Sequence, residues 1–212
     1  IACNAATINI GTNGWAVITA SALATWNDNC SSGISTWTSS DSVNIVGDTT
    51  IWVYVQDISG NIDSCSATVT VSDNNPPVAL CQPVTIYLDA AGNASIVAAD
   101  IDGGSTDNGT IVSLVASQTS FDCSNLGANN VTLTVTDDGG NSDNCIAVVT
   151  VLDTIAPTVV CQNIDAFLDA SGNVSITGAM LDGGSSDNCG TGSLNFTSSV
   201  ASFSCADLGP QT

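Results

Sequence analysis

VTLTVTDDGGNSDNCIAVVTV, residues 131–151, is the stretch that decides the fold of this chain. Its first part places Val131, Leu133 and Val135 in alternation with threonines, which is the period of two that a half-buried β-strand shows. The segment DDGGNSDN (137–144) that follows is built from turn residues. The stretch therefore predicts a strand, a turn and a second strand, rather than any helix.

The same pattern returns after about eighty residues along the whole chain. The recurring segments are 57–71 with 137–151, 77–89 with 157–169, and 102–108 with 182–188. A fixed period of this length indicates an array of one module instead of a single enzyme domain. We expect three repeats at residues 1–74, 75–154 and 155–212, the last without its final strands, so that the chain is a window on a longer array.

Alternation within each repeat predicts a β-sandwich. In the first repeat Ile51, Val53 and Val55 share one face of a strand, and Trp52 and Tyr54 share the other. About seven short strands in a repeat of this size are typical of an immunoglobulin-like fold. Short linkers containing proline separate the repeats, DNNPP (73–77) and DTIAP (153–157). The sequence therefore predicts an all-β protein of tandem immunoglobulin-like modules arranged as an elongated, semi-rigid rod.

Composition excludes many functions. The chain has no Lys, Arg or His, and its 20 acidic residues are all Asp, for a net charge of −20. Without these cationic side chains it cannot form a Ser-His-Asp or Cys-His site, and nucleic acid would be repelled. No segment reaches the ~18 apolar residues of a membrane span. Carboxylate pairs could in principle serve a glycosidase, but every acid motif recurs with the repeat, which favours architecture. We expect a protein that is not an enzyme.

Nine cysteines without a CxxC motif favour disulfides in an oxidising, extracellular setting. From their positions in the repeats we expect the pairs Cys3–Cys65, Cys81–Cys145 and Cys189–Cys205. Cys30 and Cys123 then have no partner within their own repeat, and a partner for Cys161 would follow Thr212. Closing loops of this length predicts about 4 kcal/mol of stabilisation per bond.

Two resemblances follow from these motifs. The order Asp-Asn-Cys, Phe-x-Cys-x-x-Leu-Gly, then Val-Thr-Leu-Thr-Val-Thr-Asp through Ala-Pro resembles the tandem HYR-like and Ig-like repeats of giant Bacteroidota cell-surface adhesins. It is found at 187–189, 203–209, 121–127 and 131–157. This resemblance implies export by type IX secretion to the bacterial cell surface, and a role like that of the SprB-type adhesins of gliding motility.

The second resemblance is to cadherin-type modules. ADIDGGSTDNG (99–109) is similar to a cadherin acidic loop, VTDDGG (135–140) to another, and Asp73 to Pro76 to a shortened linker. The chain departs from cadherins in having no Glu and no full DxNDN motif. The resemblance implies calcium between modules, held by fewer ligands.

Calcium needs six to eight oxygen ligands, which the loops at one end of a sandwich could supply. We expect Asp100, Asp102 and Asp137 to gather near Asp73, with Asp41 added from the first repeat. The next junction would gather Asp122, Asp153 and Asp182, although Met180 replaces the first Asp there. The alternative is that Asp, Asn and Gly are present only because they form turns well.

The aromatic residues suggest a possible second role. All tryptophans lie in the first repeat, and we expect Trp37 to be a core residue of the third strand. Trp52 and Tyr54 point outward by alternation and could stack on a glycan or on another cell-surface protein. The functional hypotheses are thus a stalk whose partners are neighbouring repeats, a glycan- or protein-binding module, and an accessory region of a secreted hydrolase.

Overall fold

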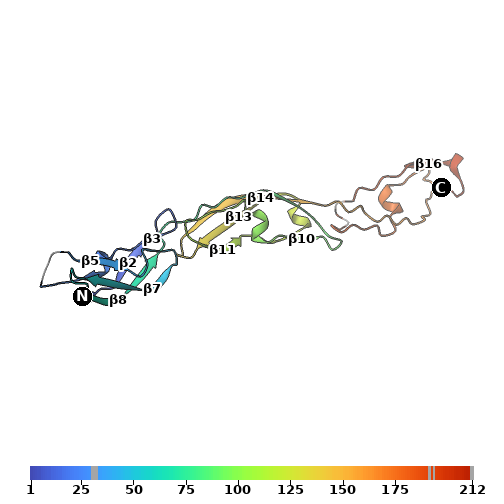
Figure 1. The fold of residues 1–212 in the computed structure, drawn as a ribbon. Coiled ribbons are helices and arrows are strands. Elements are labelled where there is room, and N and C mark those ends of the chain that lie inside the picture. Colours follow the sequence, from blue (N-terminus) through green and yellow to red (C-terminus); the bar gives the residue numbers. More distant parts are fainter. Residues whose placement is uncertain (30–32, 191, 193, 211–212) are drawn as a thin grey trace. The chain divides into compact units, whose positions relative to one another are not determined.

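The computed structural model describes residues 1–29, 33–190, 192 and 194–210, so Cys30 lies outside the described residues. The chain divides into two compact units. Figure 1 shows the ribbon coloured along the sequence. Unit 1 comprises Ile1–Val84, Ile96–Thr119 and Asn130–Val148, and unit 2 comprises Thr85–Ser95, Ser120–Asn129 and Val149–Thr212. The protein is nearly all β-structure, as predicted. Within the described ranges, no helix is both long and apolar enough to cross a membrane.

A four-stranded sheet with the order β2-β8-β7-β5 forms one layer of unit 1. The long strands β7 (Gly47–Gln56) and β8 (Ile62–Ser72) pair antiparallel, and β5 (Ser35–Thr38) pairs antiparallel with β7. Strand β2 (Ala6–Asn9) runs parallel to β8. The alternation seen in the sequence places Ile51, Val53 and Val69 inward, each at most 3% exposed.

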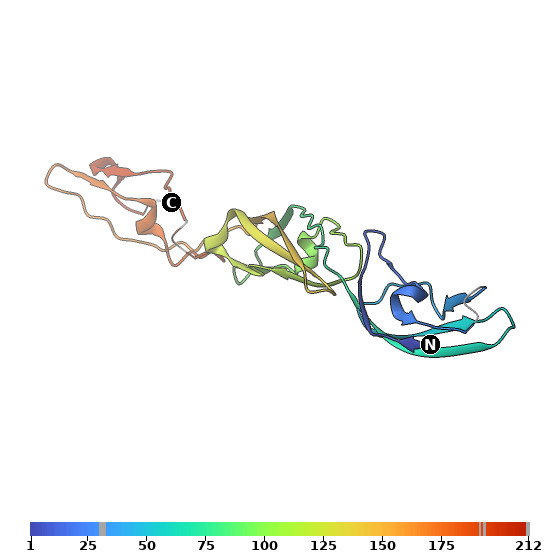
Figure 2. The ribbon, with the colours of Figure 1, turned by 90° about the vertical axis from the view of Figure 1, so that its left-hand side faces the viewer.

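Short elements supply the opposite layer. Strand β1 (Ala2–Cys3) pairs with β4 (Ala24–Thr25), and β3 (Ala16–Val17) pairs with β6 (Ser42–Val43). The one-turn helix α1 (Ala20–Leu23) packs beside β7 (Figure 2). Between the two layers lies a single apolar core, which makes this part a β-sandwich. The core residues are Ile10, Ala16, Ile18, Ala20, Leu23, Ala24, Ile51, Val53, Ala67, Val69 and Val71.

Residues 131–151 lie at the centre of a second four-stranded sheet, with the order β11-β13-β14-β9. Its strands are β11 (Ile111–Ala116), β13 (Gly127–Asp137), β14 (Ser142–Leu152) and β9 (Val84–Tyr87). Val131, Leu133 and Val135 are fully buried, as their alternation with threonine predicts. The short helix η1 (Ala98–Ile101) buries Ile101 in unit 1.

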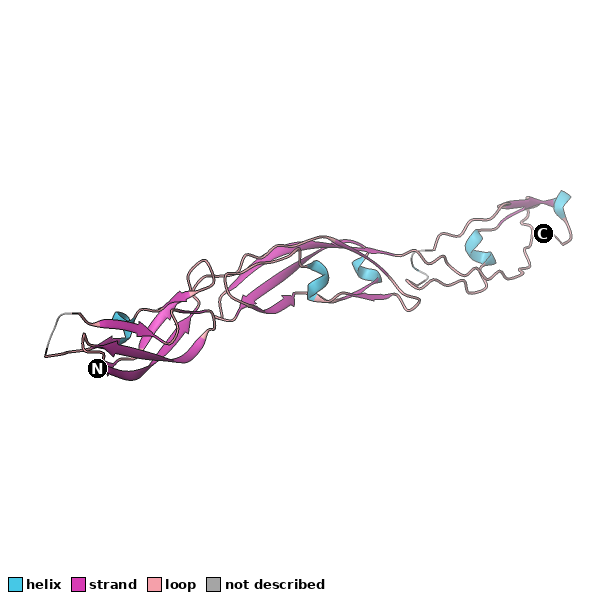
Figure 3. Ribbon diagram, in the orientation of Figure 1, coloured by secondary structure: helices cyan, strands magenta, loops and turns pink. Residues whose placement is uncertain are grey.

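Unit 2 contains two copies of one small motif. Strand β10 (Asn93–Ser95) pairs with β12 (Ser120–Asp122), and β15 (Asn173–Ser175) pairs with β16 (Ser202–Ser204) in the same register. A short helix follows each pair, η2 (Cys123–Asn125) and η5 (Cys205–Asp207), and η3 (Gly178–Leu181) lies between β15 and β16. Most of the remaining chain from residue 153 onward is loop (Figure 3).

The structure contains the expected bonds Cys3–Cys65 and Cys81–Cys145. The expected Cys189–Cys205 pair is wrong, because Cys189 is bonded to Cys123 and Cys205 is free. The reason is that the loop carrying Cys189 lies against the preceding repeat, where the Asn188 side chain donates to the carbonyl of Asp89 at 3.2 Å. Cys161 is also free and exposed.

Candidate metal centres at the repeat junctions

Asp73 begins the linker that leaves β8, and its side chain is buried, with 2% exposure. Its Oδ1 accepts from the backbone N–H of Asn75 at 2.9 Å, an Asx turn that follows from the Asp-Asn-Asn sequence. Its Oδ2 accepts from Nδ2 of Asn108 at 3.1 Å. The linker is further held by Asn141, whose Nδ2 donates to the Asp73 carbonyl at 2.9 Å. The carboxylate is therefore fixed in place by residues of the next repeat.

Two further carboxylates meet Asp73 in unit 1. Asp137 ends β13 and is 1% exposed, and its two oxygens accept from the backbone and side chain of Asn141 at 2.7 and 2.9 Å. Asp107 lies in the acidic loop, and its Oδ2 accepts from the N–H of Gly109 at 2.7 Å. One carboxylate oxygen from each of Asp73, Asp107 and Asp137 lies within 4.8 Å of the other two.

This spacing fits a single hard cation. Two oxygens that each lie 2.3–2.6 Å from one calcium ion are separated by at most about 5 Å. Oδ1 of Asp107 and Oδ1 of Asp138 are buried and have no hydrogen-bond partner. Buried carboxylates without partners are costly unless a positive charge is near, and the sequence has no Lys, Arg or His to provide one. These oxygen ligands are therefore better suited to binding calcium than to remaining without a cation.

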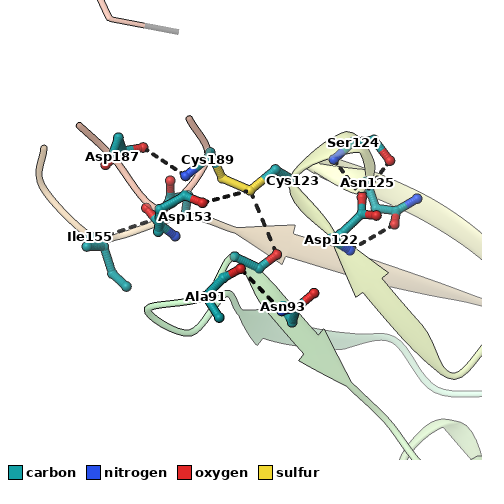
Figure 4. Close-up of a disulfide and its surroundings, with 12 residues drawn as sticks. Ala91, Asn93, Asp122, Cys123, Ser124, Asn125, Asp153, Ile155, Asp187 and Cys189 are labelled. Atoms are coloured by element: carbon teal, nitrogen blue, oxygen red, sulfur yellow. Dashed lines mark hydrogen bonds between the residues drawn. A yellow bond between two sulfur atoms is a disulfide. The ribbon is translucent and has the colours of Figure 1, made fainter. Parts of the chain in front are cut away.

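Unit 2 contains a poorer version of the same cluster (Figure 4). Asp153, the counterpart of Asp73, accepts at Oδ1 from Nδ2 of Asn188 at 3.1 Å and from the N–H of Ile155 at 3.1 Å. Oδ1 of Asp187 and Oδ1 of Asn188 are buried without a partner. The Cys189 sulfur is also close, but it is bonded to Cys123 and is no ligand for a hard cation.

A second contact is common to the two junctions. Nδ2 of Asn108 lies 3.4 Å from the carbonyl of Gly11, and Nδ2 of Asn188 lies 3.2 Å from the equivalent carbonyl of Asp89. The glycine three positions later has a positive φ in both turns, +79° at Gly14 and +77° at Gly92. A Cβ there would lie 2.5 Å from the Asn108 carbonyl oxygen, or 2.8 Å from that of Asn188. Each junction thus needs glycine for the close approach of the next acidic loop.

The acidic loop itself is shaped by its first aspartate. Oδ1 of Asp102 accepts from the N–H of Ser105 at 2.9 Å and from its hydroxyl at 2.6 Å. The hydroxyl bond, followed by the backbone bond, holds the pKa of Asp102 below its usual value. In unit 2 Ser185 lowers the pKa of Asp182 in the same way. These carboxylates are engaged in turn formation, and the loop presents Asp107 or Asp187 to the linker instead.

Eight aspartates were expected to bind metal. Of these, the structure brings Asp73 and Asp137 together in unit 1 and places Asp153 in the unit 2 cluster. It does not bring the other five to these clusters. Asp100 caps η1 through the N–H of Val97, Asp122 caps η2 through the N–H of Ser124, and Oδ1 of Asp41 accepts from the Thr38 hydroxyl. Asp102 and Asp182 form the turns described above. Sequence reasoning missed Asp107 and Asp187, although both stand in the recurring DGGS[ST]DN motif, because it selected the first aspartate of that motif.

Three aromatic side chains of β5 and β7, Trp37, Trp52 and Tyr54, lie on the outer face of their sheet, whereas Trp26 packs against the core. Trp52 is 46% exposed on β7, as alternation predicts. Trp37 is 40% exposed, so the expectation that it is a core residue is wrong. It pairs with Tyr54 across β5 and β7, and the two rings stack with centroids 5.5 Å apart. The core is filled instead by aliphatic residues, which leaves the indole ring to cover the sheet surface.

No known protein family and no curated protein matches this chain. Among solved structures it is similar to the I-band fragment from titin, with 13% identity over 82% of this chain and 71% of that chain and a TM-score of 0.32. It is similar to the protocadherin gamma B4 extracellular domain, with 15% identity over 82% of this chain and 36% of that chain and a TM-score of 0.33. It is also similar to mouse clustered PcdhgC3, with 17% identity over 53% of this chain and 45% of that chain and a TM-score of 0.28. The chain thus spans less than half of the two protocadherin structures. At these low TM-scores the β-sandwich assignment rests on the sheets described above.

Proposed function

We propose that this chain is a non-enzymatic spacer of an extracellular adhesin, in which successive repeats are joined end to end through cation-bridged junctions. One observation carries the proposal. A linker aspartate meets the Asp-Asn pair of the following acidic loop twice, at Asp73 with Asn108 and at Asp153 with Asn188. A contact that recurs with the repeat serves the array as a whole, whereas a catalytic site needs to occur only once.

Charge supports calcium as the bridging ion. The first junction gathers Asp73, Asp107, Asp137 and the unpartnered Oδ1 of Asp138 in a buried setting. Several carboxylates at this spacing repel one another strongly where water is scarce. A divalent ion removes that repulsion and takes up the unpartnered oxygens, so its binding free energy adds to the free energy of unfolding of unit 1.

The finer assignment follows the sequence resemblance to giant Bacteroidota surface adhesins. Disulfides Cys3–Cys65 and Cys81–Cys145 suit an oxidising compartment outside the cell. We place the spacer at the bacterial cell surface, with neighbouring repeats of the same chain as its immediate partners. We include a function in adhesion or gliding motility in this proposal. That function would depend on the adhesive domain that the spacer holds away from the cell.

Calcium titration of the full chain tests the bridging ion. We expect calorimetric binding of calcium and a rise in the melting temperature that chelator reverses. Asp107→Asn removes one ligand from the first junction and should reduce both effects. Asp165→Asn is the matched control, because it deletes the same charge from an exposed loop residue outside either cluster.

Two results would contradict the cation bridge. The first is a melting temperature that is the same with calcium and with chelator at low ionic strength. The second is an equal loss of calcium binding in Asp107→Asn and Asp165→Asn, because that would indicate a diffuse counter-ion atmosphere instead of a site.

The exposed aromatic residues favour a second candidate function, recognition of a glycan or a protein by unit 1. Trp52 and Trp37 present flat apolar surface to solvent, and the half-buried Tyr54 stacks on Trp37. Such surfaces stack on sugar rings and on partner side chains. A glycan array probed with the full chain and with Trp52→Ala tests this function. Signals that the substitution abolishes would support it, and an array without signals above background would argue against glycan recognition.

A further inference from the structure

Cys123 and Cys205 occupy the same place in successive copies of one motif. Each follows a short strand pair and opens a short helix, η2 or η5. Each lies four residues before a glycine with positive φ, Gly127 at +98° and Gly209 at +115°. Cys123 forms the disulfide to Cys189 of the following repeat, whereas Cys205 is an exposed free thiol.

The two sulfur atoms also share a contact with the backbone of their own repeat. The Cys123 sulfur lies 3.8 Å from the carbonyl of Gly92, and the Cys205 sulfur lies 3.8 Å from the carbonyl of Gly172. Because a disulfide sulfur has no proton, the first is a contact and not a hydrogen bond. Gly92 and Gly172 have φ of +77° and +78°, and a Cβ on them would lie 2.9 and 2.8 Å from the respective sulfur.

The turn beside Cys205 is formed as it is beside Cys123. Oδ1 of Asp89 accepts from the N–H groups of Ala91 and Asn93, both at 2.9 Å. Oδ1 of Asp169 accepts from those of Ser171 and Asn173, at 2.9 and 3.0 Å. The Asp89 carbonyl accepts a hydrogen bond from Nδ2 of Asn188, the residue before Cys189. The Asp169 turn, Gly172 and Cys205 therefore form the same receiving surface for an Asp-Asn-Cys loop.

We propose that Cys205 forms an inter-repeat disulfide with the cysteine of an Asp-Asn-Cys loop in a further repeat of this kind. The pattern of replacement agrees. At the first junction Val43 lies opposite Ala16 as Phe121 lies opposite Ala94, so the position of Cys123 is Ile45, and the position of Cys189 is Gly109. Both cysteines are thus present or both are absent at a junction.

The bond requires an oxidant, and a small-molecule disulfide such as glutathione disulfide is sufficient. The two thiols form one S–S bond and lose two protons and two electrons. The glutathione disulfide gains them and becomes two thiols, by way of a mixed disulfide. The tether between repeats raises the local concentration of the second thiol, which favours the correct pair over mixed disulfides. This cross-link goes beyond the proposed cation bridge and does not depend on it.

The test extends the full chain by a second copy of residues 131–212 placed after Thr212. The extension completes the third repeat and adds a fourth that brings its own Asp-Asn-Cys loop. Gly192→Ala in the appended copy marks its peptide by mass, at a position where a Cβ meets nothing within 4 Å. The protein is refolded in a glutathione buffer with calcium and again with chelator. Asp-specific and chymotryptic cleavage without reductant then separates Cys189 from Cys205 for mass spectrometry.

We expect a peptide that joins Cys205 to the appended Cys189, in a yield comparable to the Cys123–Cys189 peptide of the same molecules and in both buffers. Cys205→Ser should remove the first peptide and leave the second. Three results would overturn the inference: a free Cys205 beside an intact Cys123–Cys189 bond, a Cys205 paired with glutathione or Cys161 in most molecules, or the absence of both inter-repeat bonds.

Discussion

At the scale of single residues, hydrogen bonds decide which aspartate does what. Asp102 is held by Ser105 and forms a turn, whereas Asp107, five positions later, keeps a buried oxygen without a partner. The same division separates Asp182 from Asp187. The sequence shows two aspartates in one motif, and it cannot show which one the serine engages. For this reason the sequence predicted only part of the carboxylate cluster that the structure brings together.

Asp102→Asn tests the turn through its dependence on pH. The Ser105 bonds favour the carboxylate, so the folded pKa of Asp102 lies below its unfolded value. The stability that results is present above about pH 4, the ordinary range of a carboxyl pKa, and is lost as the pH falls through the folded pKa. Relative to Asp165→Asn, the substitution should lower the free energy of unfolding at about pH 7, and the difference should shrink as the pH falls below about 4. Urea denaturation across this pH range measures this, and a deficit that is independent of pH would refute the assigned cause.

At the scale of elements, the glycine turns fix how closely an acidic loop approaches the preceding repeat. Gly14→Ala would place a Cβ 2.5 Å from the Asn108 carbonyl oxygen, whereas Gly104→Ala, also at positive φ, meets nothing within 4 Å. Both should lose about 1–2 kcal/mol to backbone strain. Overpacking should cost Gly14→Ala about 1–3 kcal/mol more. Equal losses in urea denaturation would show that the loop does not lie against this turn.

The disulfide between the start and the last strand of the second repeat is an element of stability. The double variant Cys81→Ser/Cys145→Ser should lose about 4 kcal/mol of unfolding free energy, because the open loop gains conformational entropy when it unfolds. Cys161→Ser, which removes an exposed free thiol, is the control and should change little. Chemical denaturation measures both. A double variant as stable as the control would mean that the bond adds nothing to the folded repeat.

The strands were the most predictable elements. Alternation identified β7, β8, β13 and β14 correctly because the middle of one face of each is apolar and buried. The misplacement of Trp37 has a physical cause, since β5 is exposed along most of its length and alternation there carries little information. The Cys189–Cys205 error has another cause. Sequence spacing favoured a bond within one repeat, but the position of Cys189 depends on a contact between repeats.

At the scale of the whole molecule, the proposed function follows from what recurs. The same glycine turn, linker aspartate and acidic loop meet at both junctions. The residue that follows the Asp-Asn pair of the loop is Gly109 at the first junction and the disulfide-bonded Cys189 at the second. In an array whose junctions are all alike, each junction sets the position of one repeat relative to the next, and this requires no catalytic centre. The proposed adhesin spacer thus depends on the junctions holding the repeats in a line.

Small-angle X-ray scattering of the full chain in calcium tests that claim most directly. Three repeats in a line should give a longest dimension beyond about 100 Å, given the rise of about 3.3 Å per strand residue. We expect this length in calcium and a broader range of dimensions in chelator. A compact particle with a single shared interior, or identical scattering in calcium and in chelator, would contradict the account.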